Sequence, residues 1–375
     1  MKSVIQVLPA LNQGGVERGT IEIAVALKQA GIPNYVISSG GKMVTELKKI
    51  GVEHITLSVA TKNPIKLWLN ARKMTKIFKE KEVGLVHVRS RAPAWSVKWA
   101  CAKAGIPFIA TYHGRYGTQP AIKKLYNQVM VQGEKVIAVS NFIKKHLMDE
   151  YQVPEEKIIV IPRGADIKLF NPDQVGQDKV QTFLVQNDIP TDKPIIALVG
   201  RLSRVKGQSV MLEAVKQMKH QEITLLFVGG NPKGDYDKEL QAKLAELPEE
   251  TTVKIFSASG KEMPVVYAAS DIFIQPSLIP ESFGRSIAEA GAMKRIVIAS
   301  AHGGALELIE NGKTGFLTPV GDATALAQMI DKVLDMTPDQ RAKIGEAACE
   351  NVRKNFTIQK MCEKTLSLYL EFLNN

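Results

Sequence analysis

The sequence has only three cysteines, and their spacing matches no metal site. Cys101, Cys349 and Cys362 lie far apart along the chain, whereas zinc sites place pairs of cysteines a few residues apart. An odd number of cysteines also leaves one thiol over in any disulfide framework. Because thiols stay reduced in the cytoplasm, these cysteines predict a cytoplasmic protein without structural disulfides.

Long apolar runs are absent as well. No stretch approaches the roughly 18 apolar residues that a membrane-spanning helix requires, and the first ten residues resemble a strand rather than a targeting signal. The 375 residues suffice for two domains, each with its own core. We therefore expect that any contact of this protein with a membrane is peripheral.

Positive charge is in excess, and it is concentrated in the first half. The net charge is +11; residues 1–180 contain 27 Lys and Arg against 14 Asp and Glu, and the remainder contain 22 against 24. Within residues 62–81, apolar positions alternate with cations in the pattern of an amphipathic helix. Such a helix either presents a solvated face or binds the anionic inner face of the cytoplasmic membrane. Nucleic acid is not the expected partner, because no nucleic-acid-binding motif accompanies the charge.

Short β-branched runs alternate with helical patterns along the chain. This alternation predicts an α/β fold of parallel sheets in two Rossmann-like domains. The stretch 171–193 is polar, lacks a strand and is interpreted as a linker, so we expect domains at 1–180 and 181–356. A final helix, about residues 357–375, is expected to pack back on the first domain. The predicted strands are residues 4–8, 35–38, 54–57, 85–88, 108–112, 136–139, 158–161, 194–199, 224–228, 253–256, 272–274, 296–299 and 315–318.

Polar residues follow several predicted strands, at the edge where ligands of open parallel sheets bind. Two such strand ends in each half predict an active site in a cleft between the domains. In the first half, Gly14 and Gly15 open a helix, which is a weak signal for phosphate binding because a tight turn also uses glycine. His113 follows the fifth strand and is favoured over His87 as the functional histidine.

In the second half, Arg201 and Lys206 lie between glycines directly after a strand. A guanidinium and an ammonium at this spacing can hold a diphosphate and stabilise the charge that develops when it leaves. Further along, Glu281 and Glu289 flank a predicted junction at which Ser282 caps a helix that begins at about Phe283. A helical rise of about 1.5 Å per residue separates the carboxylates by roughly 12 Å, which suits a nucleotide sugar.

Three other patterns are interpreted as structural or incomplete. Asp235 and Asp237 form a metal-binding D-x-D pattern, but they open a predicted helix, where acidic residues suit the helix dipole. Lys313 and its neighbours resemble a phosphate loop, but Glu307 stands where that loop requires glycine. No turn for a nucleophilic serine is present, and we expect neither a metal nor another cofactor.

Together these segments resemble the retaining glycosyltransferases of family four, which have the two-domain GT-B architecture. The resemblance covers nearly the whole chain, and the spacing of Glu281 and Glu289 is the family's E-x7-E element. It also rests on the glycine pair near the start and on residues 138–140, 161–166, 200–207, 227–230, 276–289, 303–309 and 311–317.

The resemblance implies transfer of a hexosyl unit from a nucleoside-diphosphate sugar, with retention of configuration and without a metal. His113 would bind the transferred sugar near its reacting carbon, and Glu281 would contact the sugar hydroxyls. Glu289 would hold the ribose. The other donor-binding residues would be Gly14, Gly15, Arg201, Lys206, Ser282, Phe283, Gly284 and Arg285, of which Arg285 stands where the family often has an aliphatic residue and either adjoins the sugar or faces solvent.

The acceptor is less visible in the sequence. The basic first half resembles bacterial enzymes that extend lipopolysaccharide or other lipid-linked envelope glycans at the inner membrane. Two alternatives stay open: a sugar-nucleotide epimerase of the same fold and a non-catalytic nucleotide-sugar-binding protein. The candidate acceptor-side cations are Arg89, Arg91, Arg115, Lys123 and Lys124.

Overall fold

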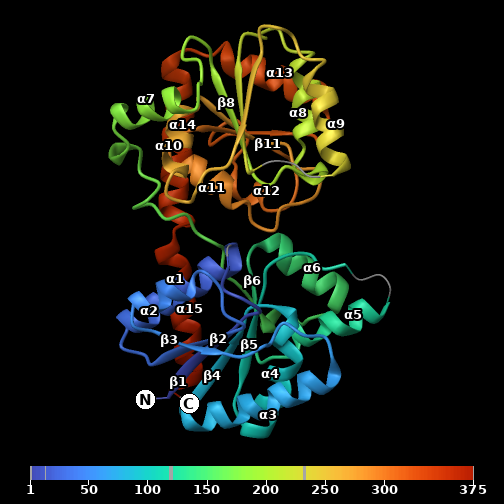
Figure 1. The fold of residues 1–375 in the computed structure, drawn as a ribbon, viewed down its shortest axis with the longest axis vertical. Helices are drawn as coiled ribbons and strands as arrows, with labels where there is room; N and C mark the ends of the chain where they lie inside the picture. Colours follow the sequence, from blue (N-terminus) through green and yellow to red (C-terminus); the bar gives the residue numbers. More distant parts are fainter. Residues whose placement is uncertain (1, 13, 118–120, 231–233, 375) are drawn as a thin grey trace. The chain divides into compact units, whose positions relative to one another are not determined.

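The chain divides into two compact units, each built on one parallel sheet with helices around it (Figure 1). The computed structural model describes residues 2–12, 14–117, 121–230 and 234–374. Unit 1 comprises Met1–Pro162 and Gln359–Asn375, and unit 2 comprises Arg163–Ile358. The two-sheet architecture predicted from the alternating pattern is therefore confirmed.

Unit 1 has a seven-stranded parallel sheet in the order β3-β2-β1-β4-β5-β6-β7. Its central strands β1 and β4 are buried along their whole length, as parallel strands covered on both faces are. The strands are β1 Ser3–Val7, β2 Asn34–Ser38, β3 Glu53–Thr56, β4 Val83–Val88, β5 Phe108–Tyr112, β6 Val136–Ala138 and β7 Ile158–Val160; the helices are α1 Gly15–Gln29, α2 Val44–Lys49, α3 Pro64–Glu80, α4 Arg91–Ala104, α5 Ala121–Gln128, α6 Asn141–Tyr151 and α15 Ile358–Leu373.

Unit 2 has a six-stranded parallel sheet in the order β10-β9-β8-β11-β12-β13. The strand order reverses between β8 and β11, which is where open α/β sheets bind ligands. The strands are β8 Ile195–Val199, β9 Thr224–Val228, β10 Thr252–Phe256, β11 Ile272–Gln275, β12 Ile296–Ser300 and β13 Phe316–Thr318; the helices are α7 Gln177–Gln186, α8 Gln208–Val215, α9 Asp235–Leu244, α10 Met263–Ala269, α11 Arg285–Ala292, α12 Ala305–Leu308, α13 Ala323–Leu334 and α14 Pro338–Asn355. Every predicted strand is present, with ends that differ by at most two residues.

The boundary between the units lies earlier than the predicted one at residue 180. Residues 171–193, interpreted above as a linker, contain α7 and belong to unit 2. Val180 and Leu184 lie one helical turn apart and are buried in the core of unit 2, as is Phe170 before them. The absence of a strand in this stretch therefore reflects a packed helix, and the linker interpretation is wrong.

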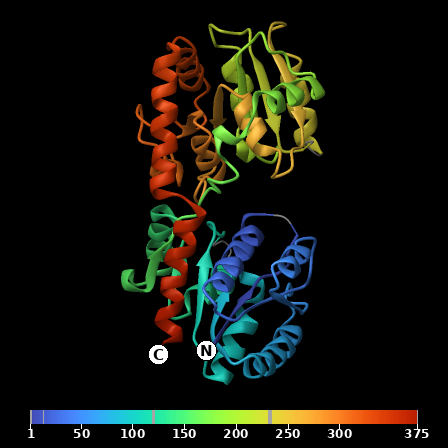
Figure 2. The ribbon, with the colours of Figure 1, turned by 90° about the vertical axis from the view of Figure 1, so that its left-hand side faces the viewer.

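The last helix, α15, lies against unit 1 (Figure 2). Tyr369 on this helix is fully buried, and its hydroxyl hydrogen-bonds the Nδ1 of His87 on β4. The Oγ1 of Thr111 lies 2.7 Å from the other ring nitrogen of His87. Near the other end of the helix, the thiol of Cys362 contacts the carbonyl of Glu22 at 3.7 Å. Helix α15 is thus part of the core of unit 1. Within the described ranges, no helix is both long and apolar enough to cross a bilayer.

We expect Tyr369→Ala to lower the free energy of unfolding of unit 1 by about 3–5 kcal/mol, because deleting a buried aromatic ring leaves a cavity. Tyr369→Phe keeps the ring but removes the hydrogen bonds of its hydroxyl with His87 and Arg89, and should cost about 1–3 kcal/mol. Urea denaturation measures both changes. Leu370→Ala is the matched control, because this neighbour is 39% exposed. An equal loss of stability in Leu370→Ala would contradict the burial of this helix face.

Candidate functional site

The carboxyl end of β8 carries the two cations that the sequence predicted to bind phosphate. The chain leaves β8 at Gly200, passes the exposed Arg201 and makes a short 3-10 helix, Arg204–Lys206, before α8. The following residue, Gly207, lies against the backbone of Pro276 at the end of β11. Because β8 and β11 are neighbours in the sheet, the loops after them meet at one edge.

Lys206 and Glu281 form an ion pair across these two loops. The Nζ of Lys206 hydrogen-bonds Oε1 of Glu281, and the same oxygen accepts a hydrogen bond from Oγ of Ser277 at 3.1 Å. The side chains of Lys206 and Glu281 are 21% and 26% exposed. The structure therefore brings together a predicted cation and a predicted carboxylate in a partly desolvated place, still open to a ligand.

A pair of glycines after β12 fixes the loop that carries Glu281. The backbone N–H of Gly304 donates to the carbonyl of Glu281 at 2.7 Å. A Cβ atom on Gly304 would lie 2.1 Å from the carbonyl oxygen of Phe283, and one on Gly303 would lie 2.4 Å from that of Glu281. Since only glycine permits so close an approach, this backbone contact sets the position from which the Glu281 side chain extends.

The helix after this loop begins later than the sequence predicted. Helix α11 starts at Arg285, and its N-cap is Gly284 in the left-handed conformation, with φ of 96°. The prediction that the helix begins at about Phe283 is therefore wrong, and Gly284 occupies the N-cap position that was predicted for Ser282. The positive φ at Gly284 is the reason, because it interrupts helical geometry just before Arg285. Phe283 instead packs in the core of unit 2, and Ser282 lies half-buried in the loop.

Glu289, in the second turn of α11, accepts hydrogen bonds from two side chains of unit 2, Arg285 and Tyr267. The Nε of Arg285 donates to Oε1 of Glu289 at 3.2 Å, and the hydroxyl of Tyr267 donates to Oε2, also at 3.2 Å. Burial and the neighbouring carboxylate raise the pKa of Tyr267 well above its usual range, so its hydroxyl remains a donor. Arg285 therefore faces Glu289, four residues along the same helix.

His302 belongs to this part of the molecule but was not among the predicted residues. It follows β12 directly and precedes Gly303. Its ring hydrogen-bonds the backbone of Ser277 and lies close to Glu281. The signal in the sequence that could have identified His302 is its place directly after a strand and beside a glycine pair.

His113 follows β5 at the carboxyl edge of the unit 1 sheet and is half-buried. Arg91 holds the loop after it: its guanidinium lies 3.9 Å from the ring centre of Tyr116 and donates to Oδ1 of Asn127 at 2.9 Å. Asn127 in turn donates to the carbonyl of Gly117 at 3.1 Å. Arg91, predicted on the acceptor side, thus supports the loop that positions His113.

The glycine pair near the start of the chain forms the beginning of α1. Gly15 is the first residue of the helix and Gly14 is its N-cap. The carboxylate of Glu17, in the first turn, lies so close to Gly14 that a Cβ atom there would be 2.6 Å from it. These glycines therefore bring a helix N-terminus to the carboxyl edge of the unit 1 sheet.

The remaining acceptor-side candidates differ in exposure. Arg89 is only 3% exposed, contacts Tyr369 of α15 and has its pKa lowered by burial. It is therefore not available at the surface, contrary to the prediction, because α15 covers it. Arg115 and Lys123 are exposed, and Lys124, on α5, is half-buried.

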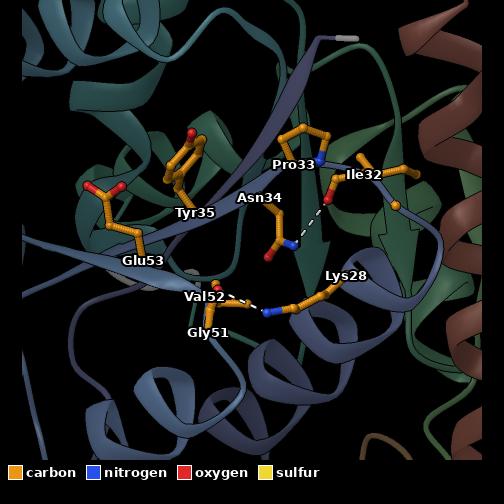
Figure 3. Close-up of a pocket in the computed structure, with 9 residues that line it drawn as sticks. Lys28, Ile32, Pro33, Asn34, Tyr35, Gly51, Val52 and Glu53 are labelled. Atoms are coloured by element: carbon orange, nitrogen blue, oxygen red, sulfur yellow. Dashed lines mark hydrogen bonds between the residues drawn. The ribbon is translucent and has the colours of Figure 1, made fainter.

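A separate hollow of about 390 Å³ lies elsewhere on unit 1 (Figure 3). It is lined at the amino ends of β2 and β3 by residues that include Lys28, Asn34, Gly51 and Glu53. The Nζ of Lys28 reaches the carbonyl of Gly51 at 3.4 Å and forms part of the wall. None of the predicted site residues lines this hollow, which lies away from the edge where parallel sheets bind ligands.

The acidic D-x-D pattern lies where the sequence predicted. Asp235 and Asp237 are in the first turn of α9. Among the residues that the structure describes, no three His, Cys, Asp or Glu side chains gather as metal ligands would.

Comparisons with known proteins give matches to both halves of the chain. Residues 180–351 match the family described as Glycosyl transferases group 1, and residues 13–169 match Glycosyltransferase Family 4. The crystal structure of a glycosyltransferase from Rickettsia africae ESF-5 is 40% identical, with a TM-score of 0.92. That match covers 100% of this chain and 99% of the Rickettsia chain.

Two further proteins are more distantly similar. Spore coat protein SA of Bacillus subtilis (strain 168) is 26% identical over 302 residues, which are 78% of this chain and 79% of the Bacillus protein. Anabaena Alr3699/HepE, solved in complex with UDP and glucose, is 23% identical with a TM-score of 0.82. The Anabaena match covers 98% of this chain and 99% of that chain, and it is a likeness of fold.

We expect Gly304→Ala to destabilise unit 2, because the added carbon would meet the carbonyl oxygen of Phe283 at 2.1 Å. Overpacking of this kind costs about 1–3 kcal/mol, which thermal unfolding detects. Gly260→Ala is the matched control, since a Cβ atom on the exposed Gly260 would meet no atom within 4 Å. The same melting temperature for both variants would refute the close backbone contact.

Proposed function

We propose that this chain, which belongs to the group 1 glycosyltransferases, transfers a hexosyl unit from a nucleoside-diphosphate sugar to a glycan or lipid-linked acceptor. The proposed reaction retains configuration at the anomeric carbon and needs no metal ion. Its donor site lies on unit 2, at the carboxyl edge of the sheet.

The ion pair between Lys206 and Glu281 carries this proposal. It holds a cation and a carboxylate side by side, with the exposed Arg201 on the same loop as the cation. A nucleotide sugar complements both groups, because its diphosphate is an anion and its sugar is rich in hydroxyl donors. We infer that the diphosphate binds Lys206 and Arg201, while the sugar hydroxyls donate to Glu281.

The same cations account for the proposed departure of the nucleoside diphosphate. Negative charge develops on the diphosphate as the bond to the sugar breaks, and two positioned cations stabilise that charge. The positive charge of Lys206 and Arg201 supports a reaction in which no metal ion holds the diphosphate. Glu289 is proposed to hold the ribose hydroxyls, with Tyr267 and Arg285 keeping its carboxylate in place.

Unit 1 is proposed to supply the groups that contact the reacting sugar. His113 would bind the sugar near its reacting carbon, from a loop that Arg91 and Asn127 hold in one conformation. Such preorganisation lowers the cost of ordering the site when the ligand arrives. Gly14 and Gly15 would offer backbone N–H groups at the start of α1 to the sugar or phosphate.

The base of the donor is best sought first among uridine nucleotides. The Anabaena protein that shares this fold was solved with UDP and glucose. Two rivals remain, an epimerase of the same fold and a non-catalytic nucleotide-sugar-binding protein. An epimerase would change the sugar without an acceptor, and a binding protein would release no nucleoside diphosphate.

We propose further that the acceptor is an envelope glycan, such as lipopolysaccharide, at the inner face of the cytoplasmic membrane. Helix α3 supports this with an exposed apolar group next to exposed cations. Ile65, Trp68 and Leu69 are 70%, 51% and 44% exposed, and the guanidinium of Arg72 lies 4.8 Å from the centre of the Trp68 ring. An amphipathic helix of this kind binds anionic lipid by apolar burial and by charge. Its exposed cations are Lys66, Arg72, Lys73, Lys76 and Lys79, and Lys62 lies just before the helix.

Release of nucleoside diphosphate from UDP-, GDP- and ADP-sugars tests the reaction. We expect one class of donor to be turned over, and we expect His113→Ala and Arg201→Ala each to lower turnover about 100-fold, as loss of a transition-state donor does. Lys238→Ala, on α9, is a control cation outside the site. Wild-type rates in both site variants would remove the proposed site.

Flotation with phosphatidylglycerol vesicles tests the membrane contact. The triple change Ile65→Ser, Trp68→Ser and Leu69→Ser should reduce binding strongly, and added salt should weaken the wild type by screening the charges. Val185→Ser, at a 77% exposed apolar position on α7, is the matched control. Wild-type binding that is equally weak to anionic and to neutral vesicles would argue against the contact.

A further inference from the structure

His302 lies within the proposed donor site, but the proposed reaction leaves its role open. It directly precedes Gly303 and Gly304, the pair whose backbone contacts that of Glu281. Its ring is close enough to the Glu281 carboxylate to interact with its charge. His302 therefore shares the immediate surroundings of a residue proposed to bind the sugar.

The two ring nitrogens of His302 differ in their surroundings. The ring hydrogen-bonds the backbone of Ser277, whereas Nε2 is buried and has no hydrogen-bond partner among the described residues. We assign the bond to Ser277 to Nδ1, because it is the other nitrogen of the ring. A neutral imidazole that donates through Nδ1 keeps Nε2 as an acceptor.

The surroundings favour the neutral ring. Burial lowers the pKa of His302, and the bond to Ser277 and the charge of Glu281 oppose this only in part. Its Nε2 therefore keeps a lone pair, on a ring that interacts with the charge of Glu281. The hydrogen bonds from Lys206 and Ser277 to the Glu281 carboxylate both go to Oε1.

A buried acceptor without a partner is rare in folded proteins, and a ligand hydroxyl is one group that satisfies it. We propose that His302 is a specificity-determining residue. Its Nε2 accepts a hydrogen bond from one hydroxyl group of the donor sugar, and Glu281 accepts a hydrogen bond from a neighbouring hydroxyl group. This inference rests on the proposed function. Two adjacent acceptors select a sugar that presents two neighbouring hydroxyl groups, because a sugar without one of them leaves an acceptor unpaired.

Two substitutions separate the roles of the ring nitrogens. In His302→Asn, the side-chain amide can still donate to Ser277 in place of Nδ1, but nothing replaces Nε2. In His302→Gln, the longer side chain can place an oxygen acceptor near the position of Nε2. His220→Asn is the matched control, because His220 is exposed on unit 2 and pairs with Asp335 at 2.7 Å.

Calorimetry measures how each substitution changes the Kd of a nucleotide and of its nucleotide sugar. The pairs are UDP and UDP-glucose, GDP and GDP-mannose, and ADP and ADP-glucose. For the pair that binds, we expect His302→Asn to leave the Kd of the parent nucleotide unchanged and to raise the Kd of the nucleotide sugar about tenfold. We expect His302→Gln and His220→Asn to stay close to the wild type. In the wild type, single-deoxy analogues of the bound nucleotide sugar should bind about tenfold more weakly at two or more hydroxyl positions.

The outcomes distinguish the two proposals. If the wild type binds none of the three nucleotides, the proposed function fails and this inference fails with it. If a nucleotide binds but His302→Asn leaves the Kd of its sugar unchanged, only the role of His302 is overturned. Should His302→Asn fail to fold, the analogue series decides, and weaker binding at fewer than two hydroxyl positions overturns the role.

Discussion

The close contact between two backbones in unit 2 is the constraint on which the proposed donor site depends. Gly304 donates to the carbonyl of Glu281, and Gly303 approaches the same residue at a distance that excludes a side chain. The contact holds the loop after β11 where Lys206, on the loop after β8, can reach the carboxylate. Without it, the ion pair would join two loops that move independently, and ligand binding would have to supply the free energy of ordering them.

Both glutamates of the E-x7-E element are held by cations before any ligand binds. Lys206 contacts Glu281, and Arg285 contacts Glu289 together with Tyr267. Partly exposed pairs of this kind contribute little to stability, so their main effect is on position. A group that is already in place reorganises little when an anion arrives, which is how preorganised sites stabilise developing charge. The arrangement therefore favours a role for Glu281 and Glu289 in binding hydroxyl groups over a role as general acid and base.

The strands and the residues beyond their carboxyl ends could be predicted from the sequence, because β-branched runs and the glycines after them are local signals. Features that depend on distant contacts could not. The start of unit 2 was misplaced because the burial of Val180 and Leu184 depends on the core they join. Arg89 was predicted at the surface because nothing near it in sequence shows that Tyr369 covers it. Ser282 has the composition of a helix cap, but the positive φ of Gly284 delays the helix.

The loop after β12 also separates what must stay constant in this site from what can change. Gly303 and Gly304 cannot accept a side chain without moving the backbone of Glu281 or Phe283, and Glu281 is tied to Lys206. The side chain at position 302 takes no part in that backbone contact and is held by one hydrogen bond to Ser277. A different residue there would change the groups offered to a sugar while leaving the path of the loop intact. In the proposed site, recognition of the sugar can therefore vary at position 302 without loss of the loop geometry that places Glu281 beside Lys206.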